Sequence, residues 1–99
     1  MRMSQLSPRW VHIDMFIFLC PHCQKVWLSC KRVVMSRSQQ YDIFEVLGLH
    51  GAVVPCKPEV AWKMSGSFEN GNFTVSPSLD ASASGHGHRH IKNGQVTGV

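Results

Sequence analysis

The chain has 99 residues, of which 43% are hydrophobic and 16% are charged, and its formal charge is +4. A chain of this length forms one domain at most, near the lower size at which a single hydrophobic core is stable. No segment reaches the roughly 20 apolar residues that span a membrane. His12 and Asp14 interrupt the apolar segment that follows the first arginines, so the sequence has no convincing signal peptide.

We therefore expect a reducing compartment, the cytoplasm by default, in which the four cysteines are free thiols. Six of the ten basic residues lie within residues 1–40, but no sequence pattern of a nucleic-acid-binding or membrane-binding protein accompanies them. We expect a monomer with neither kind of partner.

The first predicted element is a strand within residues 10–19, which are rich in aromatic and branched side chains. Pro21 ends it, because the residue before proline is extended and proline itself is favoured in the first turn of a helix. Residues 21–36 then show helical spacing of apolar side chains and a basic opposite face, which predicts an amphipathic helix. The apolar stripe of this helix contains Cys23, Val26, Trp27, Cys30, Val33 and Val34.

A shorter helix is predicted after Ser36, which has capping-box spacing to Gln39, and Gly48 is its expected end. Residues 52–55 predict a short strand. The alternating apolar and polar side chains of residues 58–64 predict another, half-buried strand.

Asn70-Gly71 lies between two apolar arms and indicates a β-hairpin. Residues 76–99 are rich in Ser, Gly and His and carry almost no large apolar side chains, which predicts a disordered tail. The predicted fold class is therefore α+β, with one small domain over residues 10–75 and a tail over residues 76–99. The alternative is a chain that is only partly folded.

A dithiol centre is one interpretation of Cys20-Pro21-His22-Cys23. At the start of a helix, the helix dipole and His22 would favour a thiolate at Cys20, with Cys23 as the resolving thiol. This quartet resembles the active site of the thioredoxin superfamily, in particular that of its periplasmic disulfide oxidases. The resemblance implies disulfide exchange by Cys20, Cys23 and His22, and a cis proline facing the dithiol, for which Val54-Pro55 is the candidate.

Zinc is a second interpretation. Cys20, Cys23 and Cys30 have the spacing C-x2-C-x6-C, which resembles the first half of a fungal binuclear zinc cluster. A mononuclear site of Cys20, Cys23 and Cys56 with a histidine is the alternative, because structural zinc takes four N or S ligands. The alternate histidines of the predicted tail, His86, His88 and His90, could also bind zinc or copper.

Binding to a protein partner is a third interpretation. Thr97 and Val99 at the end of the sequence resemble a ligand of PDZ domains, which add such a peptide to a sheet edge. The basic amphipathic helix, within residues 24–37, could instead lie on an acidic membrane or in a partner's groove.

The composition as a whole, with many Ser, Cys, His, Trp and Met residues and few acids, resembles that of short open reading frames without an established product. On that interpretation, which we favour from the sequence, the chain has no selected biochemical activity. Dithiol exchange and partner binding are the two functional alternatives. The sequence contains no other enzyme motif.

Overall fold

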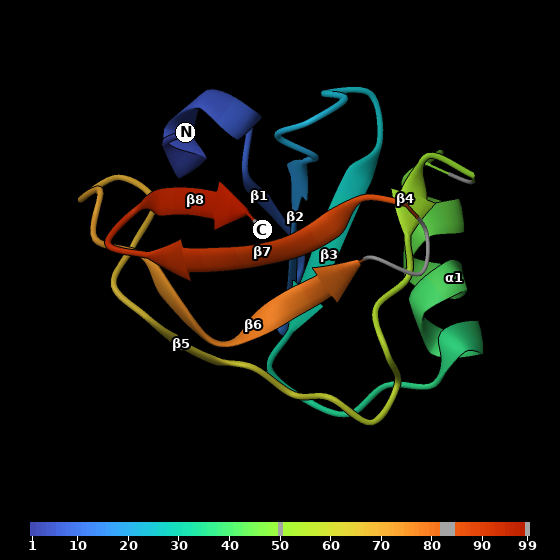
Figure 1. The fold of residues 1–99 in the computed structure, drawn as a ribbon. Coiled ribbons are helices and arrows are strands. Elements are labelled where there is room, and N and C mark those ends of the chain that lie inside the picture. Colours follow the sequence, from blue (N-terminus) through green and yellow to red (C-terminus); the bar gives the residue numbers. More distant parts are fainter. Residues whose placement is uncertain (50, 82–84, 99) are drawn as a thin grey trace.

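A computed structural model describes residues 1–49, 51–81 and 85–98 of the chain. These residues form a small α+β domain of two four-stranded sheets, one α-helix and a short 3-10 helix (Figure 1), which confirms the predicted fold class. The elements in chain order are η1 (Met3–Leu6), β1 (Arg9–His12), β2 (Met15–Leu19), β3 (Trp27–Lys31), α1 (Arg37–Val46), β4 (Val53–Val54), β5 (Lys63–Ser65), β6 (Thr74–Ala81), β7 (Gly87–Lys92) and β8 (Gln95–Gly98).

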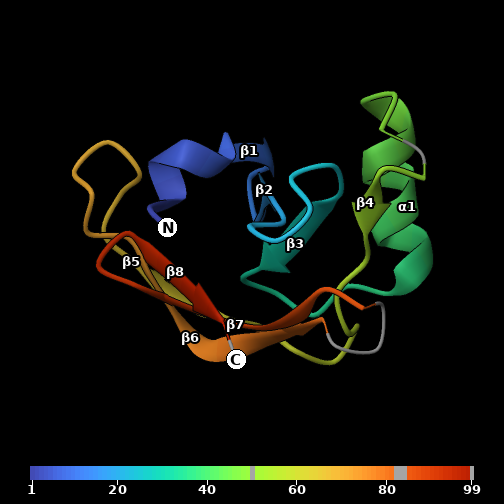
Figure 2. The same cartoon turned by 45° about the horizontal axis from the view of Figure 1, so that its top comes forward.

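The two sheets differ in topology. The first has the order β1-β2-β3-β4, in which β1, β2 and β3 are antiparallel neighbours and β4 runs parallel to β3. Helix α1 makes the crossover between the two parallel strands, as such a pair requires. The second sheet, β5-β6-β7-β8, is antiparallel throughout. In Figure 2, β4 and α1 lie on the opposite side of the molecule from β5 and β8.

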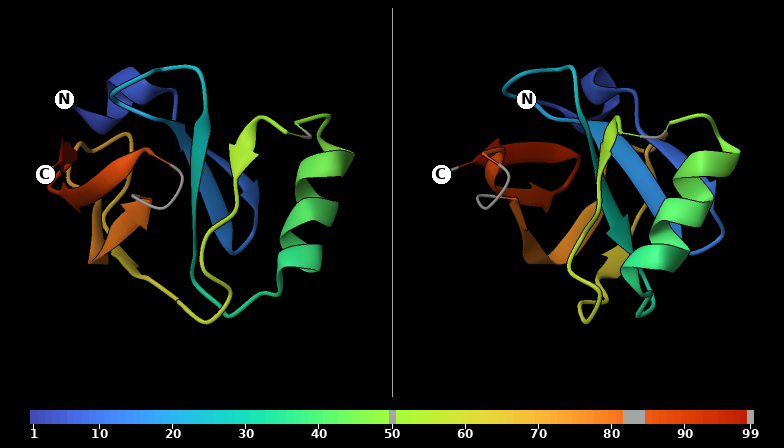
Figure 3. Two further views of the ribbon diagram at one scale, coloured as in Figure 1. Left: turned by 45° about the vertical axis from the view of Figure 1, so that its right-hand side comes forward. Right: turned by 90° about the vertical axis from the view of Figure 1, so that its right-hand side faces the viewer.

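Strand β2 is buried on both faces, because the second sheet covers one side of the first sheet and α1 covers the other (Figure 3). Phe16 and Phe18 pack into the core between the sheets. Met15 and Ile17 pack into a smaller core with Phe44 of α1. A strand covered on both faces has a continuous apolar sequence rather than an alternating one, so the predicted buried strand is confirmed in this part.

The predicted amphipathic helix over residues 21–36 is wrong. Its middle is strand β3, which pairs with β2 so that Trp27 lies opposite Leu19. Alternate residues of β3, Leu28 and Cys30, pack into the core between the sheets. Lys31 concealed the strand pattern in the sequence, because it is fully buried although a lysine is expected at the surface.

Main-chain carbonyl oxygens accept hydrogen bonds from the buried ammonium group of Lys31. Lys31 Nζ donates to the carbonyl oxygens of Lys57 and Val60, at 2.6 Å each, and it lies 5.2 Å from the centroid of the Trp62 ring. A buried charge is tolerated only with such partners. The charge of Lys31 therefore led the sequence prediction to place a core residue on the solvent-facing side of a helix.

The predicted elements of the next segment are largely confirmed. Ser36 and Gln39 form the expected capping box, with Ser36 N donating to Gln39 Oε1 at 2.8 Å and Gln39 N donating to Ser36 Oγ at 3.2 Å. Strand β4 lies within the predicted range, and Asn70-Gly71 lies in the loop that joins β5 to β6. The strand predicted over residues 58–64 is shorter and later, at Lys63–Ser65.

A disordered tail was predicted over residues 76–99, but the described part of this segment consists mainly of strands. Most of it lies in β6, β7 and β8, and the predicted domain boundary after residue 75 falls inside β6. Leu79, Ile91 and Val96 are buried, so these sparse apolar residues all contribute to the core between the sheets. Asn93 and Gly94, with φ of 50° and 76°, form the tight β7–β8 turn, and this second Asn-Gly pair was the sequence signal for a hairpin.

Candidate metal centre

A tight turn after β2 positions the two cysteines of Cys20-Pro21-His22-Cys23. Cys20 N donates to Val26 O at 2.8 Å, and Gln24 N donates to Cys20 O at 2.8 Å. Gln24 adopts a left-handed conformation with φ of 54°, which reverses the chain toward β3. The Cys-x-x-Cys spacing thus places both thiols on one short loop between two paired strands.

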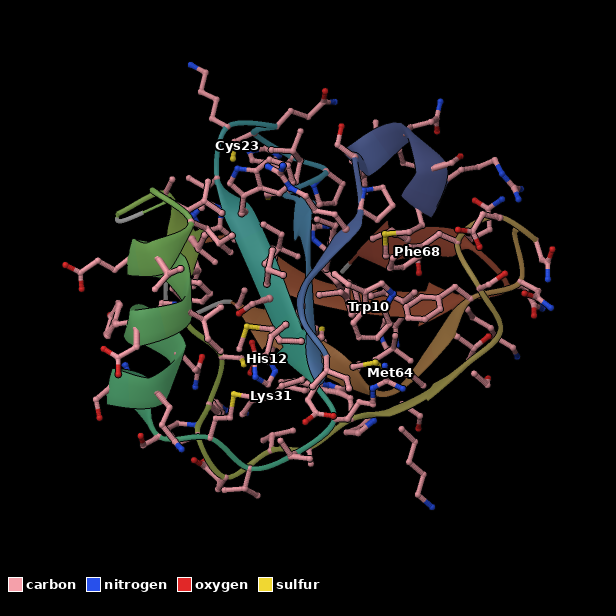
Figure 4. All side chains as sticks on the ribbon, turned by 180° about the vertical axis from the view of Figure 1, so that it is seen from behind. Trp10, His12, Cys23, Lys31, Met64 and Phe68 are labelled. Atoms are coloured by element: carbon pink, nitrogen blue, oxygen red, sulfur yellow. The ribbon has the colours of Figure 1, made fainter. Side chains whose placement is uncertain are left out.

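A histidine from the other sheet completes the cluster. The sulfur atoms of Cys20 and Cys23 and a ring nitrogen of His86 all lie within 4.8 Å of one another, and Cys23 Sγ is 3.9 Å from His86 Nδ1. His86 directly precedes β7, and its main-chain N–H donates to Ala81 O at 3.0 Å. In Figure 4, Cys23 lies at one end of the molecule, away from the surface that carries Trp10 and Phe68.

The main chain of the turn stabilises the Cys23 thiolate. The pKa of Cys23 is lowered, chiefly because the Lys25 N–H donates to its sulfur, with further donation from the Val26 N–H and the Cys20 thiol; partial desolvation opposes this. Cys20 is fully buried, whereas Cys23 and His86 are half-buried. The cluster is therefore accessible from solvent through Cys23 and His86.

Two thiolates and one imidazole are ligands that zinc takes in proteins. With Zn–S of about 2.3 Å and Zn–N of about 2.0 Å, tetrahedral geometry places a sulfur and a nitrogen about 3.6 Å apart. The 3.9 Å between Cys23 and His86 is close to this value. Cys20, Cys23 and His86 could thus bind a metal ion after a small contraction.

The other predicted ligands lie elsewhere. The Cys56 thiol donates to Gln40 Oε1 at 3.4 Å, and Cys30 is fully buried in the core between the sheets. Neither belongs to the cluster of Cys20 and Cys23. Of the cysteines in the two predicted zinc sites, only Cys20 and Cys23 lie together. The mononuclear alternative did not specify its histidine, and the histidine that lies beside these two cysteines is His86.

The three alternate histidines do not act as one set. Gly87, with φ of 77°, interrupts the extended chain after His86. His88 Nε2 lies 2.5 Å from Ser78 Oγ, and its ring stacks on that of His90 at 5.3 Å between centroids. Alternate residues share a face only in a regular strand, so the kink allows His86 to face the thiols on its own.

The arrangement that the dithiol resemblance implied is not present. Cys20 starts a turn and not a helix, so no helix dipole acts on it. His22 lies exposed in that turn. Among the described residues, the cis peptide bond is Ser76–Pro77, and not Val54–Pro55.

The structure describes one of the two predicted partner-binding residues. Thr97 lies in β8, opposite His90 of β7, and Val99 lies outside the described residues. Binding to a PDZ domain stays a prediction. The basic amphipathic helix is absent, because β3 occupies its place.

No family model, curated protein or solved structure matches this chain.

The described part of the chain includes no helix with the length and apolar character needed to cross a membrane.

Proposed function

We propose that this chain is a small metal-binding domain, in which one zinc ion held by Cys20, Cys23 and His86 joins the two sheets. The observation that carries the proposal is the convergence of the three ligand atoms within 4.8 Å. Cys23 and His86 are 63 positions apart in the sequence. A metal link that closes so long a loop is the kind expected to stabilise a fold most.

The ligand set favours zinc and also suits copper(I), because thiolates prefer both ions. Three protein ligands leave a fourth position of a tetrahedral zinc ion for water or another ligand. Cys20 contributes a sulfur that the core holds in place, and Cys23 contributes a sulfur whose lowered pKa favours the thiolate.

A competition titration of the full chain against a chromophoric zinc chelator, in the presence of a phosphine reductant, tests the proposal. Cys23→Ser and His86→Ala should each weaken zinc binding by about a hundredfold or more, because changes even beyond the direct ligands cost about 10–100-fold. Copper(I) is titrated in the same way, and binding of copper(I) alone would replace zinc as the metal.

Two matched variants serve as controls. His90→Ala removes an exposed histidine of β7, and Cys56→Ser removes a thiol outside the cluster. Both should bind zinc as the wild type does. Equal losses for His86→Ala and His90→Ala would reject the site, and so would full affinity in Cys23→Ser. The chain would then be better described by its composition, as one without a selected activity.

Disulfide exchange is a second candidate, favoured by the lowered pKa of Cys23. The Cys23 thiolate would attack a substrate disulfide and release one thiolate, and Cys20 would then displace the second, so that the substrate is reduced and a Cys20–Cys23 disulfide forms. This order differs from the predicted one, because Cys20 is fully buried. Insulin reduction by dithiothreitol tests it: a rate that the metal-free protein does not raise rejects exchange.

A further inference from the structure

A cavity of about 500 Å³ is lined by residues of β3, α1, β4 and β6. Its volume is in the range of small-molecule sites. None of Cys20, Cys23 and His86 lines it, but the lining residue Ala81 accepts the main-chain hydrogen bond of His86, so the cavity adjoins the candidate metal centre without sharing its ligands.

The inner wall is apolar. It is lined by Leu28 of β3, Val54 of β4, Leu79 of β6 and Trp62 of the segment before β5. Trp62 is only 4% exposed, and its indole Nε1 has no hydrogen-bond partner among the described residues. This nitrogen has almost no accessible surface, so it faces the interior and not the cavity, and the wall that a ligand meets at this place is apolar.

The polar lining includes two cations. Arg37, at the start of α1, and Lys57, after β4, both line the cavity with exposed side chains. Asp80 of β6 is the acidic residue of the lining. A cavity with an apolar wall and an excess of positive charge favours a ligand that has an apolar body and an anionic group.

We infer that this cavity binds a small amphiphilic carboxylate, with the apolar chain against Leu28, Val54 and Leu79. Its oxygens would accept from the cations of Arg37 and Lys57. The same chemistry occurs in a free fatty acid and in the acyl chains of an anionic lipid. We take the free acid as the ligand, because the cavity has the volume of a small-molecule site.

Isothermal titration calorimetry of the full chain with octanoate, and with octan-1-ol as the neutral equivalent, tests the inference. Octanoate should bind about tenfold more tightly than the alcohol, because hydrogen bonds to a charged group are stronger than those between neutral groups. The double variant Arg37→Gln, Lys57→Gln should lose this difference. The matched double variant Lys63→Gln, Lys92→Gln removes the same charge from exposed residues outside the lining and should keep it.

A second variant tests the cavity itself. Val60 is a half-buried lining residue, so Val60→Trp should fill the space and abolish binding of both ligands while the circular dichroism spectrum stays that of the wild type. If Val60→Trp unfolds the chain, the comparison of the two double variants alone tests the inference. Equal binding of octanoate and octan-1-ol would overturn the inference. So would an equal loss in both double variants, or binding to phosphatidylglycerol vesicles without binding of free octanoate.

Discussion

The four cysteines divide into two pairs by their position: Cys20 and Cys23 lie in the turn after β2, and Cys30 and Cys56 lie outside it. Cys23 is half-buried, whereas the other three are buried. The turn that holds Cys20 and Cys23 directs main-chain N–H groups at sulfur, and the pKa of Cys23 is lowered. Cys30 and Cys56 lie in the core, where burial, and to a lesser extent the neighbouring Cys56 thiol, raises the pKa of Cys30 well above its ordinary value. The difference shows that the main chain, and not the residue type, decides which thiols can act as ligands or nucleophiles.

The largest expected effect is in thiol reactivity. In the native, metal-free chain, iodoacetamide should alkylate Cys23 on the order of a thousandfold faster than Cys30, because labelling of Cys30 requires an opening that costs a few kcal/mol. Peptide mass spectrometry at successive times measures both rates. Comparable native rates, in a chain that circular dichroism shows to be folded, would mean that Cys30 is not in a closed core.

The next effect is the link between zinc and stability. If zinc joins the sheets, zinc at about 100 times its Kd raises the free energy of unfolding by about 2.7 kcal/mol. Urea unfolding with zinc and with a chelator measures the difference. Cys56→Ser should keep the increment and Cys23→Ser should lose it. An increment of equal size in both variants would place the ion elsewhere.

The sequence was sufficient where local chemistry decides the structure. The capping box of Ser36 and Gln39, the buried strand β2 and the hairpin at Asn70-Gly71 are all encoded by neighbouring residues, and the structure has each of them. The failures concern residues whose environment comes from distant parts of the chain. Lys31 is buried only because the carbonyl groups of the segment before β5 accept its ammonium group.

The candidate metal centre shows the same limit. The spacing of Cys20 and Cys23 predicted two of the three candidate ligands, because a turn of that length brings both sulfurs together. The choice of His86 over the neighbouring histidines depends on the left-handed Gly87 and on the packing of two sheets against each other. Neither follows from spacing, so the sequence could name the histidines only as a group.

A smaller effect is expected from replacing a sulfur by oxygen. Cys30→Ser should cost about 2 kcal/mol of unfolding free energy, because it buries a hydroxyl group in an apolar core. Cys23→Ser in the metal-free chain should cost less than about 0.5 kcal/mol, as expected for a position near the surface. Urea unfolding in the presence of a chelator measures both. Equal losses of unfolding free energy in Cys30→Ser and Cys23→Ser would show that the two positions do not differ in their surroundings.

The smallest effect is the pH dependence of Cys23. In the folded, metal-free chain the N–H groups of Lys25 and Val26 hold its pKa below the ordinary value, and in urea those contacts are lost. Alkylation of Cys23 should therefore reach half its maximal rate at a lower pH in the folded chain than in the unfolded one. His86→Ala should keep this shift, because the imidazole does not cause it.

The sign of the stability effect follows from the same shift. A thiol whose pKa is lowered on folding stabilises the folded state above the unfolded pKa, and this contribution is lost as the pH falls through the folded pKa. The free energy of unfolding of the wild type relative to Cys23→Ser should thus rise with pH through the alkaline range. A difference that is constant with pH, together with equal alkylation midpoints in the two states, would show that the turn does not hold a thiolate. Cys23 would then differ from the three buried cysteines only in exposure.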